Sequence, residues 1–240
     1  MSDERAAASA GVPPPERKIS ESIATEKRKE KTMIDYPVET LLDTRLVQVF
    51  DLQYAPGRHY FEATRRQRED LVAEKDKAAF RSMVPDAVSI CAVWHQERRE
   101  DRMLLNREFR YPLGQTVVSV PAGLIDPEDR GKDREEAVRR AAEREMFEET
   151  GIAVGEKDRF SLLHPCLFSS PGLTDESNAM GRIDLYGHAE SELNQSHAEG
   201  AEKFEGFRLV TREEAKAMMQ GEPISVYTWI GLAAFVMGLT

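Results

Sequence analysis

Cysteine is scarce in this sequence. The 240 residues include two, Cys91 and Cys166, and neither belongs to a CxxC pair or to any other zinc-binding spacing. A disulfide framework and a structural zinc site are therefore not expected. The simpler interpretation is two buried thiols in the reduced, cytoplasmic compartment.

The chain also lacks a long uninterrupted apolar run. Its N-terminus, MSDERAAASAGVPPPERK, has no apolar core and is not expected to be a secretory signal. The most apolar stretch begins at Ile224 and ends at Leu239, and it is shorter than the roughly 20 residues that a bilayer span needs. Ser225, Tyr227 and Thr228 interrupt it. We expect a buried C-terminal helix and no membrane anchor.

Positive charge is in deficit. Lysine and arginine number 33 against 43 acidic residues, for a net charge of −10. An acidic surface repels phosphate backbones, so nucleic-acid binding is not expected. A small phosphorylated ligand is still compatible with this composition, because a bound divalent cation reverses the local charge. P-loop, GxGxxG and GxSxG motifs are absent.

The chain divides into three parts. Residues 1–35 are rich in Ala, Pro, Ser, Glu and Lys, and we expect a disordered tail there. Residues 36–82 contain two β-like runs, 44–54 and 58–64, around a Pro56–Gly57 turn signal, followed by a charged helix or loop. Residues 83–240 form the expected main domain.

The main domain mixes strands with helices. Strands are predicted at 86–95, 102–110, 117–120, 160–168, 182–189 and 204–210. A long helix is predicted at 133–150, ending at Gly151, and two shorter ones follow Thr211 and Ser225. Thr211 and Glu214 make a capping-box pattern. The predicted class is therefore mixed α and β, with strands before and after one central helix.

The central helix carries three acidic residues on one face. Glu145, Glu148 and Glu149 stand at i, i+3 and i+4 in EEAVRRAAEREMFEETGI. They repel one another and crowd the negative end of the helix dipole. A hard cation such as Mg²⁺, which takes oxygen ligands and shares them with phosphates, would explain the cluster. The alternative from spacing alone is a solvated acidic helix face.

The surrounding pattern resembles the Nudix box. Residues 144–152, REMFEETGI, match its core R-E-U-x-E-E-x-G-U, where U is apolar, and Glu136 stands where the box has an earlier glutamate. The leading glycine departs from the pattern, because Arg130 occupies its usual place. Gly123, in VPAGLID, fits by context, which makes the following loop seven residues longer than usual. Glu136 then either has the role of the earlier box glutamate or only occupies its position in the sequence.

Flanking motifs are similar to one branch of that family. REFRY at 107–111, then VSVPAGLID, and SSPGLTDE at 169–176 resemble ADP-ribose pyrophosphatases and related sugar-nucleotide hydrolases. The resemblance implies an α/β/α sandwich on a mixed sheet, with the N-terminal β region forming a homodimer. Ser119 is a departure, because the family often has a glutamate there.

The resemblance also implies a set of site residues. Metal ligands would be the Ala122 carbonyl, Glu145 and Glu149, with Glu148 as a further ligand or catalytic partner. Arg144 would orient these carboxylates, and the ion would be Mg²⁺, which Mn²⁺ can replace. Substrate-binding residues would be Arg110, Pro171, Gly172 and Glu176. The general base would be Glu199 or Glu202, with Glu205 as a third candidate.

The implied activity is hydrolysis of the diphosphate bond in a nucleoside-diphosphate sugar. For ADP-ribose the products would be AMP and ribose 5-phosphate. Two alternatives stay open: a hydrolase for another dinucleotide or for a coenzyme A or flavin diphosphate, and a catalytically silent nucleotide sensor.

Overall fold

The computed structural model describes residues 37–198 and 202–240. These described residues belong to one compact unit. The expected tail at 1–35 and the candidate base Glu199 lie outside the described residues.

A small antiparallel sheet comes first. It contains β1 (Val38–Asp43), β2 (Gln48–Ala55) and β3 (Arg58–Thr64) in that order. The predicted turn at Pro56–Gly57 is confirmed, with Gly57 at φ +64°. The strand predicted to begin at Thr44 begins at Gln48 instead, because Thr44 starts a tight turn. Its hydroxyl accepts the backbone N–H of Val47 at 3.0 Å.

Residues 65–82 connect the two sheets. They contain two short 3₁₀ turns and the helix α1 (Lys77–Ser82), whose N-cap is Asp76. Arg66 Nη2 lies 2.8 Å from Asp86 Oδ2, beside the first strand of the larger sheet. This ion pair fixes the connection at the point where it enters that sheet.

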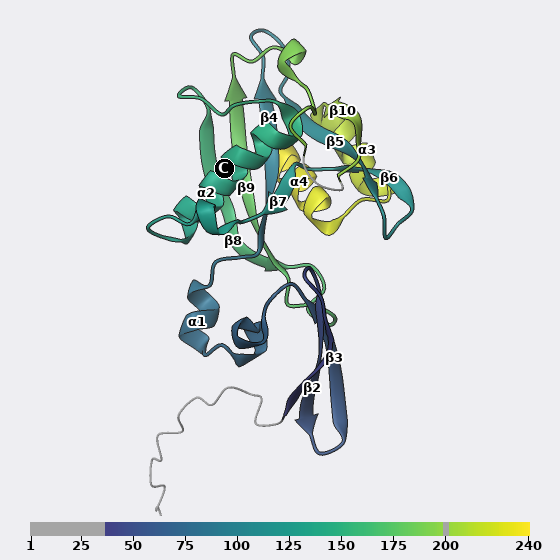
Figure 1. Cartoon of the computed structure of the whole chain (residues 1–240). Coiled ribbons are helices and arrows are strands. Elements are labelled where there is room, and N and C mark those ends of the chain that lie inside the picture. The colour runs from purple at the N-terminus through teal and green to yellow at the C-terminus, as the bar shows by residue number, and fades with distance from the viewer. Residues whose placement is uncertain (1–36, 199–201) are drawn as a thin grey trace, which may run out of the picture. The chain divides into compact units, whose positions relative to one another are not determined.

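The larger sheet has seven strands (Figure 1). Its main order is β10-β5-β4-β9-β8, with β6 paired to β5 and β7 paired to β4. Only β4 and β9 are parallel among its pairs, so the sheet is mixed as expected. The strands are β4 (Ala87–His95), β5 (Arg102–Arg110), β6 (Gln115–Ser119), β7 (Ala122–Leu124), β8 (Arg159–Phe168), β9 (Ser177–Tyr186) and β10 (Phe204–Val210).

Two of these strands differ from the predictions. β7 was not predicted, because three residues containing a glycine have no readable period. β9 begins at Ser177, five residues before the predicted start, because its first residues are small or polar although all are buried. It ends at Tyr186, before Gly187 at φ +81°.

Helices cover both faces of the larger sheet. The helix α2 (Arg134–Thr150) packs Val138, Ala142 and Met146 against one face. On the other face lie α3 (Arg212–Gly221) and α4 (Val226–Met237). β4 serves both cores, because its alternate side chains point to opposite faces. The α/β/α sandwich with a mixed sheet is therefore confirmed.

The helix ends follow the sequence signals. Asp133 caps α2 by accepting the N–H of Glu136, and Gly151 ends it at φ +76°. Thr211 and Glu214 form the predicted capping box of α3. α4 is the buried C-terminal helix that was expected, with Leu232 fully buried. In the described part of the chain, no helix has the length and apolarity of a membrane span.

Candidate active site

The last turns of α2 bring the predicted glutamates together. Glu145 and Glu149 are buried, with 6% and 3% of their surface exposed, and Glu148 is partly exposed. A solvated acidic face would leave all three in water. The buried positions of Glu145 and Glu149 therefore argue against that alternative.

Arg144 ties this cluster to the loop before α2. Its Nη1 lies 2.8 Å from an oxygen of Glu145 and 2.8 Å from one of Glu148. On its other side, Nη2 donates to Asp129 Oδ2 at 2.9 Å and to the Leu124 carbonyl at 2.8 Å. One guanidinium thus fixes two glutamates of α2 relative to β7 and the loop that follows it.

Asp129 is a further residue of the candidate site, and it was not predicted from the sequence. It follows Gly123 by six residues, the spacing that the Nudix box gives between its leading glycine and its first glutamate. It is 5% exposed and makes the ion pair with Arg144. The seven extra residues therefore lie after Asp129, and counting forward from Gly123 would have found it.

Glu136 has only local contacts. Its carboxylate accepts the Lys132 N–H at 2.8 Å and pairs with Arg140 at 2.7 Å. It also packs against Gly131, where an added Cβ would lie 2.6 Å from it. Glu136 therefore agrees with the box in its position along the sequence. The ion pair with Arg144 is made by Asp129.

Backbone of β7 approaches the glutamates closely. A Cβ added to Gly123 would lie 1.9 Å from the carboxyl carbon of Glu145, so only glycine fits there. The neighbouring Ala122 N–H donates to Glu149 Oε2 at 3.2 Å. This close approach places the Ala122 backbone among the predicted metal ligands.

Negative charge is in excess around Glu149. Burial raises the pKa of Glu149 well above its ordinary value, and the charges of Glu145, Glu202 and Glu108 raise it further. Burial likewise raises the pKa of Glu145 to about 7, and Arg144 opposes this shift. Carboxylates that lack compensating charge in a buried site fit a bound divalent cation.

No three acidic, His or Cys side chains of the described residues converge tightly enough to hold an ion as they stand. Arg144 explains this, because its Nη1 occupies the space between Glu145 and Glu148. A cation held by Glu145 and Glu148 would therefore compete with the guanidinium for their oxygen atoms.

A cavity of about 860 Å³ opens in front of the cluster. It is large enough for a nucleotide-sized ligand. Among the predicted site residues, its lining includes Arg110, Ala122, Arg144, Glu145, Glu148, Glu176 and Glu202. Glu202 and Glu205 are both exposed, but Glu202 lines this cavity, whereas Glu205 lies on β10 and is not part of the lining.

Arg110 is held at the rim of this cavity by a neighbour on its own strand. Its Nη2 lies 2.7 Å from Oε2 of Glu108, a residue that is 7% exposed. The Ser119 hydroxyl donates to the same oxygen at 3.3 Å. Position 119 lacks the glutamate common in the family, and Glu108 supplies a carboxylate directly beside it.

The SPG loop residues divide between two cavities. Glu176 lines the large cavity and pairs with Arg65 at 2.8 Å. Pro171 instead lines a smaller cavity of about 280 Å³ beside β3. The Gly172 carbonyl accepts the Tyr60 hydroxyl at 3.0 Å. These predicted substrate-binding residues therefore lie at two neighbouring places along the loop, Pro171 at the smaller cavity and Glu176 at the larger one.

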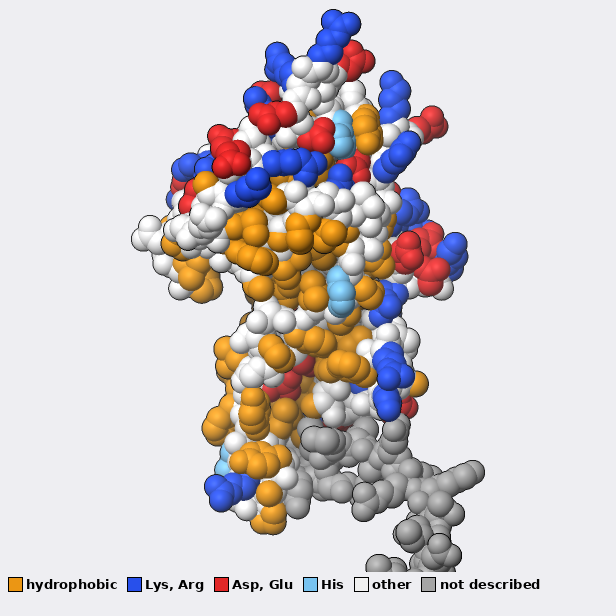
Figure 2. Space-filling view, turned by 180° about the vertical axis from the view of Figure 1, so that it is seen from behind, with side chains coloured by type: hydrophobic (Ala, Val, Ile, Leu, Met, Phe, Trp, Pro, Cys, Tyr) orange, Lys and Arg blue, Asp and Glu red, His pale blue; other side chains and the backbone are white. Residues whose placement is uncertain are grey.

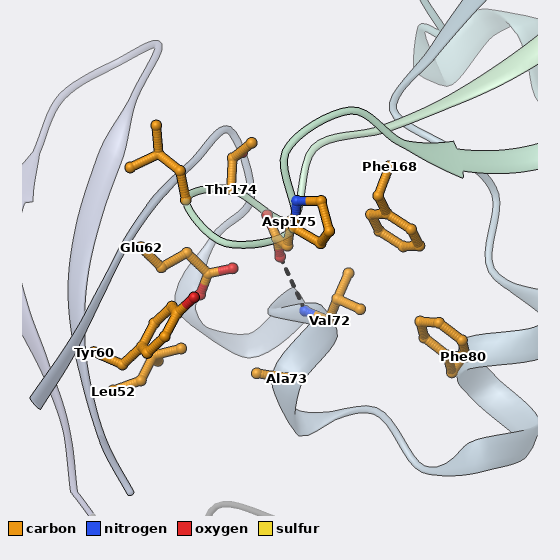
Figure 3. A pocket seen from close by; sticks show the side chains of 11 residues that line it. Leu52, Tyr60, Glu62, Val72, Ala73, Phe80, Phe168, Thr174 and Asp175 are labelled. Carbon is orange, nitrogen blue, oxygen red and sulfur yellow. Dashed lines mark hydrogen bonds between the residues drawn. The ribbon is translucent and has the colours of Figure 1, made fainter. Parts of the chain in front are cut away.

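The smaller cavity has an apolar lining with one unusual carboxyl group (Figure 3). Glu62 of β3 points into it and is 6% exposed, and its Oε2 has no hydrogen-bond partner within residues 37–198 and 202–240. Burial raises its pKa to about 7, and the charge of Asp175 adds to this shift. Aromatic walls come from Tyr60, Phe80 and Phe168.

Comparison with known families identifies the domain to which these residues belong. The model of the NUDIX domain matches residues 83–230, more than half of the chain. The chain belongs to the Nudix family. Members of this family are generally hydrolases that use divalent metal ions.

Several named relatives are similar over part of their length. A putative nudix hydrolase 2 of Caenorhabditis elegans is 30% identical, over 64% of this chain and 65% of its own. The ADP-ribose pyrophosphatase of Bacillus subtilis is 32% identical over 45% of this chain and 51% of its own. The chain thus spans about half to two thirds of the length of these relatives.

One solved structure is similar in fold. The crystal structure of an ADP compounds hydrolase superposes with a TM-score of 0.51 and 20% identity, over 84% of this chain and 92% of that one. At this identity the similarity establishes the Nudix fold alone.

Proposed function

We propose that this Nudix protein is a magnesium-dependent hydrolase of ADP-ribose, giving AMP and ribose 5-phosphate. The observation that carries the proposal is the pair of buried glutamates, Glu145 and Glu149, at a cavity that also has Arg110 in its wall. Similarity to a protein named ADP-ribose pyrophosphatase supports the choice of substrate.

The metal would be held by Glu145, Glu149 and the Ala122 carbonyl, with Glu148 as a further ligand. A bound divalent cation neutralises diphosphate charge and lowers the pKa of a coordinated water. The protein itself contributes Arg110, which stabilises the negative charge that develops on the phosphate oxygens. Arg144 orients the glutamates from behind.

Glu202 is our candidate for the general base. It lines the large cavity, and its charge raises the pKa of Glu145, Glu149 and Glu108. A residue this close to the cluster can receive a proton from the attacking water.

The smaller cavity supports a substrate with a nucleobase. Its aromatic walls suit a flat ring, and Glu62 Oε2 offers an acceptor to a ring N–H donor. Residues 174–176 contribute to both cavities, with Asp175 in the smaller one and Glu176 in the larger. A ligand reaching both could place its base in the first and its diphosphate in the second.

A substrate panel tests this proposal. Purified protein with Mg²⁺ is incubated with ADP-ribose, UDP-glucose, GDP-mannose, a dinucleoside polyphosphate, flavin dinucleotide and coenzyme A, and products are separated by chromatography. ADP-ribose should be hydrolysed with the highest kcat/KM. A higher kcat/KM for another member would reassign the substrate. Saturable ADP-ribose binding without hydrolysis in Mg²⁺ or Mn²⁺ would indicate a sensor.

We also propose that the protein is a homodimer formed through the β1–β3 sheet. Several large apolar side chains of this sheet and of its β1–β2 turn are exposed, including Phe61 at 57% in β3 and Leu46 at 66% in the turn. On the face seen in Figure 2, hydrophobic side chains gather over the middle and lower part of the molecule. Apolar patches of this kind usually mark interaction surfaces, and a second copy of the chain would bury them.

A further inference from the structure

The strand β5 changes character along its α2-facing side. Leu104 lies in the apolar core under α2. The next residues on the same face are Asn106 and Glu108, since side chains alternate along a strand. Both are buried, at 0% and 7% exposure. This polar stretch faces the glutamates of α2.

Asn106 contacts Glu149 directly. Its Nδ2 donates to Glu149 Oε2 at 2.6 Å, and the Ala122 N–H donates to the same oxygen at 3.2 Å. Oε1 of Glu149 accepts from neither donor. The two carboxylate oxygens are therefore distinguished, because both of these donors bind Oε2.

The amide of Asn106 is costly to bury. Its Oδ1 has no hydrogen-bond partner among the described residues. An unsatisfied buried acceptor destabilises the fold, so an apolar residue would serve packing better at this position. This cost suggests that the Nδ2 end of the amide, which donates to Glu149, has a function.

We propose that Asn106 is a positioning residue for the metal centre, which holds Glu149 Oε2 so that Oε1 is presented to the cation. The asparagine amide suits this positioning role because it is an uncharged hydrogen-bond donor. Lysine or arginine would neutralise Glu149 and repel a divalent ion, whereas an apolar residue would leave the carboxylate free to rotate. The inference rests on the proposed metal-dependent function.

Binding of Mn²⁺ alone to the metal-free protein tests the inference. Affinity is measured by electron paramagnetic resonance and by calorimetry for wild type, Asn106→Leu and Asn106→Ala. Partners that orient a metal ligand typically contribute about 10–100-fold to affinity. We expect a loss within that range in both variants, with circular dichroism showing a folded protein. Using two variants of different size guards against misfolding of either one.

Two further variants test whether a loss of Mn²⁺ affinity is specific to Asn106. Gln48→Leu is a matched control, because Gln48 is another sheet amide, 2% exposed, whose Oε1 has no hydrogen-bond partner in the described part of the chain. It should bind Mn²⁺ like wild type. Glu149→Gln should abolish tight binding, which locates the ion independently of Asn106.

The outcomes separate the two proposals. If Glu149→Gln weakens Mn²⁺ binding but both Asn106 variants bind within twofold of wild type, the role of Asn106 is refuted and the metal site stands. An equal loss in Gln48→Leu would also refute it. If Glu149→Gln binds Mn²⁺ like wild type, the proposed metal site itself is wrong.

Discussion

Glu149 combines near-complete burial with an unfavourable charge environment. It is 3% exposed, and three other glutamates raise its pKa. Glu149→Gln keeps the shape but removes a charged metal ligand. We expect kcat to fall by about 10²–10³-fold, since a metal contributes several kcal/mol of charge stabilisation. Steady-state kinetics with ADP-ribose and Mg²⁺ measure this, and activity near wild type would contradict the placement of the metal.

The raised pKa of Glu62 predicts that the free energy of unfolding depends on pH. Its folded pKa of about 7 lies above the ordinary 4.5, so the folded state binds this proton more tightly than the unfolded state does. Its contribution is present at low pH and is lost as pH rises from about 4.5 to about 7. The shift corresponds to on the order of 3 kcal/mol.

Urea unfolding of Glu62→Gln beside wild type measures this contribution. The variant should be more stable at pH 8 and should gain little at pH 5. Taking the difference removes the similar effects of Glu145 and Glu149, which both proteins share. An equal difference at the two pH values would contradict the protonation of Glu62 in the folded protein.

At the scale of elements, Arg144 and Asp129 join α2 to the loop after β7. Asp129→Asn should remove the nearer of two charged partners of Arg144 on that side, and leaves Asp126, whose Oδ2 lies 3.3 Å from Nη2. Removing one member of a partly buried ion pair should destabilise the fold by about 1–3 kcal/mol. It should also lower kcat by roughly tenfold, because the glutamates that Arg144 orients would shift. Chemical denaturation and kinetics check both effects.

Glu136→Gln is the matched control for Asp129→Asn. Glu136 makes only local contacts, with Lys132 and Arg140. Its substitution should leave kcat and the unfolding midpoint close to wild type. A large loss of activity here with none in Asp129→Asn would restore Glu136 as the functional acid of the box.

These two residues illustrate how far the sequence alone could predict the site. Helix α2, its caps and its three glutamates are local features, so spacing was enough to find them. Asn106 could not be found in this way, because its contact with Glu149 spans 43 positions between two elements. Strand periodicity placed β4 and β5 well but missed β7, whose pairing with β4 depends on tertiary structure.

At the scale of the whole molecule, the exposed apolar residues of the small sheet have to be explained. Leu46, Tyr54 and Phe61 are 66%, 57% and 57% exposed. Such a surface in a chain with net charge −10 favours specific association, because like charge elsewhere opposes random aggregation. The proposed dimer would therefore be formed by this sheet.

Leu46→Glu should disrupt that dimer. Leu46 lies in the turn between β1 and β2. A carboxylate buried there in an apolar interface would be desolvated without a partner charge, which costs several kcal/mol. Sedimentation velocity at micromolar concentration should show a dimer for wild type and a monomer for Leu46→Glu.

Met237→Glu is the control, since Met237 is 65% exposed at the end of α4, outside the small sheet. If both variants sediment as wild type does, the interface lies elsewhere. If wild type is itself a monomer, the apolar face of β1–β3 needs another partner.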